Sequence, residues 1–204
     1  MTTESAFRIA FWVLFGGVLV MRACFSLRVR RAGERVMPDR EAIKREGRGA
    51  FALRVLMFFL LLAWLGLYAV NPYWMEVLSA PFPGWLRWAG FALGLASLGF
   101  WVWTQLALGK EWSPQLQLRE EHHLVTTGPY ARIRHPLYTA MIGYGTSLAL
   151  VSANWGFMAL AVSAIAALIV RVPKEEQMMI EGFGERYRTY MQKTGRFFPA
   201  LRRR

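Results

Sequence analysis

The chain has 204 residues, of which 55% are hydrophobic, and it carries a formal net charge of +12. A soluble domain has about 45–50% apolar residues, so this apolar excess, with nine tryptophans and a mean hydropathy of +0.25, excludes an ordinary soluble protein. The single cysteine, Cys24, excludes an intramolecular disulfide.

The apolar residues are concentrated in five runs, which cover residues 7–21, 51–70, 85–108, 137–151 and 155–170. A transmembrane helix needs about 20 apolar residues. The second and third runs supply that length, whereas the other three are shorter and need support from flanking residues or neighbouring helices. We therefore predict an all-α integral membrane protein with five transmembrane helices, folded as a single membrane domain over residues 1–204. The first run is expected to be a retained anchor, because Glu4 precedes Arg8 and no small-x-small cleavage pattern follows it.

The basic residues alternate with the apolar runs along the chain. Nine lie within residues 22–48, four between the third and fourth runs, and nine after the fifth, whereas residues 71–84 and 152–154 contain none. Because the cytoplasmic loops of membrane proteins are enriched in Lys and Arg, this alternation predicts an external amino terminus and a cytoplasmic carboxyl terminus. The positive charge then reflects topology and attraction to anionic lipid headgroups, and we expect no nucleic-acid partner.

The first half of the chain, residues 1–108, is expected to form transmembrane helices 1–3 with a basic cytoplasmic loop over residues 22–50. Gly90 and Gly94 in the third run have the four-residue spacing that lets two helix backbones approach closely in lipid. We therefore expect the third helix to pack tightly against a neighbour.

The second half, residues 109–204, ends in two helical segments. Only three residues separate the last two apolar runs, which predicts an antiparallel helical hairpin over residues 137–170. Residues 175–193 predict a cytoplasmic amphipathic helix. Its apolar side chains fall near helical spacing: Met178, Met179, Phe183, Tyr187 and Tyr190.

Reactive side chains gather just before and just after this hairpin. Because the two ends of an antiparallel hairpin lie at the same membrane face, we expect these side chains to meet there. The residues brought together in this way are Arg134, His135, Tyr138, Arg171, Glu175 and Glu176. Taken singly, the arginines also fit ordinary interfacial positions, and the glutamates also fit the first turn of a helix, where carboxylates are favoured. The three histidines, His122, His123 and His135, lack the spacing of a metal motif, so no metal site is expected.

Three blocks around the hairpin resemble the signature of the isoprenylcysteine carboxyl methyltransferase family, in a prokaryotic-type form. They are His122-His-Leu-Val-Thr-Thr-Gly-Pro-Tyr130 with Arg134-His-Pro-Leu-Tyr138, then Arg171-Val-Pro-Lys-Glu175-Glu176, then Phe183-Gly-Glu-Arg-Tyr187-Arg-Thr-Tyr190 with Gly195-Arg-Phe-Phe-Pro199. Order and spacing are similar over residues 105–199, about half the chain, whereas the first hundred residues are similar only in forming membrane helices.

The resemblance implies a membrane methyltransferase that uses S-adenosylmethionine without a Rossmann fold, with residues 109–204 as the cofactor-binding catalytic region. By position, the implied cofactor ligands are Gln115, His122, His123, Leu124, Val125, Tyr130, His135, Pro136, Leu137, Tyr138 and Glu175. The implied catalytic set is Arg134, Arg171, Glu175 and Glu176, with Arg171 facing the methyl acceptor. A carboxylate acceptor needs no general base, whereas an amine or hydroxyl acceptor would require proton removal by Glu176 or a histidine.

The implied partners are the lipid bilayer and a lipophilic or lipidated acceptor, and the implied location is a bacterial inner membrane. Carboxyl O-methylation of an isoprenylcysteine-like acceptor is the main functional hypothesis. Three alternatives stay open at this point: a sterol-reductase-like enzyme that uses NADPH, a phospholipid N-methyltransferase-like activity, and a membrane scaffold without enzymatic activity.

Overall fold

A computed structural model describes residues 3–31, 48–70, 76–109 and 124–200. Within these ranges the chain forms six α-helices and one short 3₁₀ helix, with two isolated β-bridges and no strand. In chain order they are α1 (Thr3–Arg31), α3 (Arg48–Val70), α5 (Gly84–Leu108), η2 (Gly128–Ala131), α6 (Pro136–Ser152), α7 (Trp155–Phe183) and α8 (Glu185–Lys193). The predicted all-α class is confirmed for this part of the chain.

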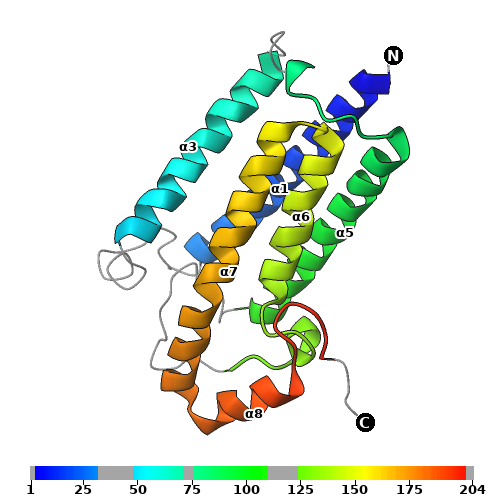
Figure 1. The fold of residues 1–204 in the computed structure, drawn as a ribbon. Coiled ribbons are helices and arrows are strands. Elements are labelled where there is room, and N and C mark those ends of the chain that lie inside the picture. The colour runs from blue at the N-terminus through cyan, green and yellow to red at the C-terminus, as the bar shows by residue number, and fades with distance from the viewer. Residues whose placement is uncertain (1–2, 32–47, 71–75, 110–123, 201–204) are drawn as a thin grey trace.

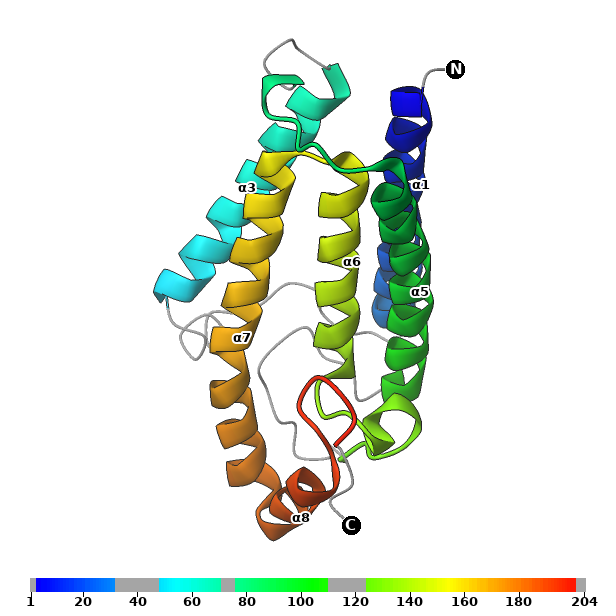
Figure 2. The same cartoon turned by 45° about the vertical axis from the view of Figure 1, so that its right-hand side comes forward.

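The long helices form a bundle with α6 in its interior (Figures 1 and 2). Helix α6 lies between α5 and α7 and also packs against α1, whereas α3 lies at the outside of the bundle beside α7. The core contains Phe11 and Leu14 of α1, Tyr144 of α6 and Phe157 of α7, all buried. Small residues of α5 let α6 approach closely: a Cβ atom on Gly90 would lie 2.6 Å from Leu150 Cβ. The predicted tight packing of the third apolar run is confirmed.

Within the described part of the chain, four helices are long and apolar enough to cross a membrane: α1, α3, α5 and α7. The fourth apolar run forms α6, which has 17 residues and is not among these four. The predicted count of five transmembrane helices is therefore not confirmed. Because α1, α5 and α7 surround α6, this helix needs less contact with lipid than the outer helices do.

The predicted hairpin between the last two apolar runs is confirmed. Helix α6 ends at Ser152, Ala153 takes a left-handed conformation at φ 45°, and α7 begins at Trp155. The Asn154 side chain caps α7 by accepting hydrogen bonds from the backbone N–H of Gly156 at 3.0 Å and of Phe157 at 3.4 Å. The Nε1–H of Trp64 donates to the same oxygen at 3.1 Å, which connects α3 to the turn.

The boundary of the amphipathic segment is predicted wrongly. The apolar run ends at Val170, but α7 continues through Pro173 to Phe183, so that the polar residues 171–183 extend the same helix. The helix ends at Gly184, whose φ of 56° is a conformation that favours glycine, and α8 then begins at Glu185. Proline often marks a helix end, yet Pro173 lies inside α7, with helical residues on both sides of it.

At the end of the bundle that carries the α6–α7 turn, one buried arginine connects three helices. Arg87 of α5 is 7% exposed and donates to both carboxylate oxygens of Glu4 in α1, at 2.6 and 2.9 Å. Its Nε–H donates to the carbonyl oxygen of Val151 in α6 at 3.0 Å, and its guanidinium lies 3.9 Å from the centre of the Phe7 ring. This arginine therefore connects α5 to both α1 and α6.

Substitution Arg87→Met is expected to lower the melting temperature of the purified protein. The free energy of unfolding should fall by about 1–3 kcal/mol, because the Val151 carbonyl loses its hydrogen-bond donor. The exposed carboxylate of Glu4 can be solvated instead, so the cost stays below that of a fully buried pair. Thermal unfolding in detergent checks the effect, with Arg186→Met, at an exposed position of α8, as the control. Equal melting temperatures for the two variants would contradict the assignment.

Candidate functional site

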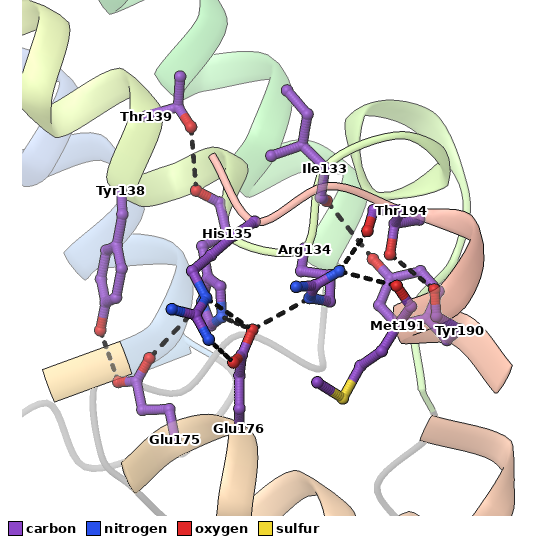
Figure 3. Close-up of polar contacts among 11 residues, drawn as sticks. Ile133, Arg134, His135, Tyr138, Thr139, Glu175, Glu176, Tyr190, Met191 and Thr194 are labelled. Atoms are coloured by element: carbon purple, nitrogen blue, oxygen red, sulfur yellow. Dashed lines mark hydrogen bonds and ion pairs between the residues drawn. The ribbon is translucent and has the colours of Figure 1, made fainter. Parts of the chain in front are cut away.

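The reactive residues meet where the hairpin opens, at the end of the bundle opposite the α6–α7 turn (Figures 1 and 3). They come from the start of α6, from the polar part of α7 and from the chain after α8. We call this group the hairpin-mouth cluster, and it consists of Arg134, His135, Tyr138, Arg171, Glu175, Glu176 and Arg196. The predicted convergence of the two ends of the hairpin is confirmed.

Glu175 is the more accessible of the two neighbouring carboxylates. The Tyr138 hydroxyl donates to its Oε1 at 2.5 Å, and Arg171 Nε donates to the same oxygen at 2.7 Å. Its other oxygen lies 3.8 Å from His135 Nδ1. The Glu175 side chain keeps 17% of its surface exposed, so a polar ligand can reach this carboxylate.

Glu176 is almost completely enclosed, with 5% of its side chain exposed. Arg134 Nε donates to its Oε1 at 3.0 Å, and Arg196 donates to its Oε2 at 2.5 Å and to its Oε1 at 3.3 Å. Both oxygens are therefore engaged by guanidinium groups, as Figure 3 shows for Arg134. Such charge-assisted hydrogen bonds are the strong ones in proteins, and here they tie α7 to the segments before α6 and after α8.

His135 stands between the two carboxylates, immediately before α6. Its ring is parallel to that of Tyr138, with an interplanar angle of 9° and centroids 5.5 Å apart. Its Nε2 is buried without a hydrogen-bond partner among the described residues and lies 3.4 Å from Glu176 Oε1, too poorly aligned to form one. Burial lowers the pKa of His135, although Glu175 and Glu176 oppose this effect. Burial therefore favours the uncharged imidazole.

The chain after α8 holds the segment before α6 by backbone hydrogen bonds. The N–H groups of Arg134 and His135 donate to the carbonyl oxygens of Gly195 and Arg196 at 2.8 and 3.0 Å, and Gly195 N–H donates to Arg132 O at 3.1 Å. The Arg134 guanidinium also donates to the carbonyl of Thr194. A Cβ atom on Gly195 would collide with the carbonyl oxygen of Phe198, so only glycine fits this turn.

Tyr190 of α8 contacts Tyr130 of η2, which is one of the predicted site residues. The Tyr190 hydroxyl donates to the carbonyl oxygen of Tyr130 at 2.6 Å, and both side chains are buried. Burial raises the pKa of Tyr190 to about 12, so its phenol stays protonated and remains a donor. Helix α8 therefore supports η2 through a neutral hydrogen bond.

The structure describes only some of the other predicted ligands. Pro136 is buried in the first turn of α6, Leu137 packs against the core, and Leu124 and Val125 are half-buried in the segment before η2. Gln115, His122 and His123 lie outside the described residues. Among the residues that are described, no group of three or more His, Cys, Asp or Glu side chains is arranged to hold a metal ion.

Sequence reasoning missed Arg196 as a member of the cluster. This arginine belongs to the block Gly195-Arg-Phe-Phe-Pro199, which resembles part of the family signature without indicating a role for the arginine. Its position 20 residues after Glu176 carries no helical periodicity that would connect the two. The Gly195-Arg pair itself was the available signal, because a glycine next to a charged residue after a helix marks a turn that presents a side chain.

Comparisons with known proteins point to one family for this part of the chain. Residues 89–181 match the model of the isoprenylcysteine carboxyl methyltransferase (ICMT) family. A solved structure of the eukaryotic intramembrane Ras methyltransferase ICMT superposes with a TM-score of 0.57 at 23% identity, covering 70% of this chain and 51% of that one. At this identity, the superposition supports the fold alone.

Three curated relatives are similar over part of their length. The nickel-cobalt-cadmium resistance protein NccN of Alcaligenes xylosoxydans xylosoxydans is 29% identical over 132 residues, and the cobalt-zinc-cadmium resistance protein CzcN of Cupriavidus metallidurans is 30% identical over 135 residues. Each match covers 61% of this chain, and 60% and 59% of the respective relatives. Protein-S-isoprenylcysteine O-methyltransferase B of Arabidopsis thaliana is 35% identical over 83 residues, which is 37% of this chain and 39% of that protein. The chain thus matches about three fifths of the two bacterial proteins and less of the plant one.

Proposed function

We propose that the chain is a member of the isoprenylcysteine carboxyl methyltransferase family, whose model matches residues 89–181, and that it is an integral membrane methyltransferase that uses S-adenosylmethionine. The reaction we propose is carboxyl O-methylation of a lipophilic or isoprenylcysteine-like acceptor. The observation that carries the proposal is the accessible Glu175 carboxylate, which Tyr138 and Arg171 hold at the hairpin mouth. This carboxylate lies inside the stretch that matches the family.

The residues at the hairpin mouth suit the polar groups of this cofactor. Glu175 can accept hydrogen bonds from an ammonium or a ribose hydroxyl, and the unpartnered Nε2 of His135 can meet a further polar group. The parallel rings of His135 and Tyr138 offer an aromatic face next to them. Bound there, S-adenosylmethionine would supply an electrophilic methyl group on its sulfonium sulfur. Gln115, His122, His123, Leu124, Val125, Tyr130, Pro136 and Leu137 complete the proposed ligand set.

Arg171 is the residue that we propose to orient the acceptor carboxylate. It stands at the end of the apolar part of α7, where a lipophilic molecule from the bilayer meets the polar cluster. An acceptor carboxylate held by Arg171 would already be ionised, so no residue of the cluster would have to remove a proton from it. Proximity, orientation and exclusion of water then supply most of the rate.

Glu176 and Arg134 act in this proposal by positioning other groups. Glu176 is enclosed by Arg134 and Arg196, which leaves it poorly placed to remove a proton from an acceptor. Its hydrogen bonds fix the orientation of Arg134 and, through the chain, of His135. An amine acceptor, as in a phospholipid N-methyltransferase, would need a base, and this arrangement favours a carboxylate acceptor instead.

We also propose how the protein is oriented in the membrane and which membrane it lies in. A single membrane domain with five spans, including α6, would place the hairpin mouth at the cytoplasmic face, with the amino terminus outside the cell. Residues 109–204 would form the cofactor-binding region. A bacterial inner membrane suits the two relatives from bacteria.

Calorimetric titration of the purified full-length protein with S-adenosylmethionine tests the proposed cofactor site. Substitution Glu175→Gln is expected to weaken binding about 10–100-fold, because a hydrogen bond to a charged group contributes about 1.5–3 kcal/mol. The control is Glu181→Gln, an exposed carboxylate of α7 whose partner is Gln177. A wild-type protein that binds only NADPH would favour a reductase, and one that binds neither cofactor would favour a scaffold.

Transfer of a radiolabelled methyl group then identifies the acceptor. A prenylated cysteine analogue with a free carboxylate is expected to be labelled, whereas its carboxamide and phosphatidylethanolamine are not. Labelling of the amine lipid alone would overturn the choice of a carboxylate and support N-methylation.

A further inference from the structure

A polar cavity lies at the opposite end of the bundle from the hairpin mouth. Its volume is about 640 Å³, within the range of about 300–1,000 Å³ found for small-molecule sites. The starts of α1 and α5, the end of α3, the segment before α5 and the α6–α7 turn all contribute to its wall. Charged side chains of both signs line it: Glu4, Arg8, Glu76 and Arg87.

Exposed tryptophans indicate at which level of the membrane this cavity lies. Trp85 and Trp88 in the first turns of α5 are 71% and 47% exposed, and Trp155 at the start of α7 is 51% exposed. Tryptophans of membrane proteins are enriched at the level of the lipid headgroups. The cavity is formed by residues next to them in the chain, so its mouth lies where headgroups are concentrated.

Three of the four charged side chains, those of Arg8, Glu4 and Glu76, remain available for a ligand, whereas Arg87 is buried. Arg87 and Glu4 form a bidentate ion pair, and the Glu4 carboxylate keeps 60% of its surface exposed. Arg8 uses one terminal nitrogen to donate to the carbonyl oxygens of Tyr68 and Ala69, at 3.0 and 3.1 Å. Since a guanidinium carries five N–H donors, Arg8 can hold an anion as well. Glu76 is exposed at the rim and forms no ion pair with another described residue.

We propose that this cavity binds a zwitterionic phosphoethanolamine group, as found in the headgroup of a phospholipid. Arg8 accepts the phosphate, and Glu76, with the exposed carboxylate of Glu4, accepts the ammonium. A simple anion would be repelled by the two carboxylates, and a metal ion would be repelled by the two guanidinium groups. A ligand that carries both charges meets a partner for each of them.

Native mass spectrometry of the full-length protein in detergent tests this site with defined lipids. We expect phosphatidylethanolamine to remain bound and phosphatidylglycerol, which lacks the ammonium, to bind at least tenfold more weakly. The variants Arg8→Gln and Glu76→Gln are each expected to reduce retention of phosphatidylethanolamine at least fivefold. Arg28→Gln, an exposed arginine at the other end of α1, is the control and should leave retention unchanged.

Soluble glycerophosphoethanolamine distinguishes a lipid from a free zwitterion as the occupant. If it competes at a concentration similar to that of the lipid, the headgroup chemistry holds and the occupant is a soluble molecule. Because Glu76 is exposed, its substitution tests the site even if Arg8→Gln impairs folding. Equal retention of the two lipids, or retention that neither variant changes, would overturn the proposal.

Discussion

Substitution Glu176→Ala is expected to lower the rate of the proposed methyl transfer about 100-fold and to lower the melting temperature as well. The change removes the carboxylate that both Arg134 and Arg196 contact, and it leaves Arg134, whose side chain is 10% exposed, without its counter-ion. Breaking a buried ion pair by removing one partner costs about 3–5 kcal/mol. Arg196 is 46% exposed and can be solvated, so we expect a value near 3 kcal/mol, equivalent to about 100-fold if expressed in the rate.

The position of His135 explains why activity should fall with stability. Its backbone is held by the chain that carries Arg196, and its ring lies beside Glu176. Once the two arginines repel each other, the segment before α6 loses the geometry that presents Glu175 and Tyr138 to a ligand. The measurements are thermal unfolding and the Kd for S-adenosylmethionine, followed by methyl transfer.

Two further variants separate this explanation from general damage. Glu185→Ala removes a glutamate of α8 whose side chain is 81% exposed, and it should leave both properties unchanged. In a double-mutant cycle, the combined substitution Glu176→Ala with Arg196→Ala should lower the free energy of unfolding by less than the sum of the two single substitutions, because each removes the partner of the other. Additive costs would show that the two residues are not coupled.

Sequence patterns are sufficient for the parts of this fold that depend on regular repetition. The apolar runs predict the helices, and the short separation at Ser152 predicts the hairpin, because few other arrangements bury such runs. The hairpin in turn brings His135 next to Glu175 without any further information. Topology therefore accounts for most of the candidate site.

The parts that sequence cannot supply depend on single tertiary contacts. Pro173 usually marks a helix end, yet α7 continues past it, because tertiary contacts made by Glu175 and Glu176 hold the polar half in place. Arg196 joins the cluster through a turn that only Gly195 permits. Neither contact corresponds to a periodic pattern of residues in the sequence. The different roles proposed for Glu175 and Glu176 likewise depend on how deeply each side chain is buried, which only the structure shows.

Substitution Gly90→Leu is expected to destabilise the packing of α5 against α6. Even the first atom of a side chain at Gly90 would lie 2.6 Å from Leu150 Cβ and 3.4 Å from the backbone of Ser147 and Val151. Leu150 Cβ is fixed to the α6 backbone, so no rotamer change can relieve the contact. Overpacking of this kind costs about 1–3 kcal/mol, and here it must push α5 away from α6.

The series Gly90→Ala, Gly90→Leu and Gly99→Ala isolates this effect by thermal unfolding in detergent. Gly99 lies on the same helix, where an added Cβ atom would meet nothing within 4 Å, and alanine favours a helix over glycine by about 1 kcal/mol. Gly99→Ala should therefore keep or raise the melting temperature, whereas Gly90→Ala lowers it and Gly90→Leu lowers it further. Since lipid gives helices no hydrophobic force to associate, close backbone contact is what holds α5 to α6. A Gly90→Ala variant as stable as Gly99→Ala would show that the two helices can separate without cost.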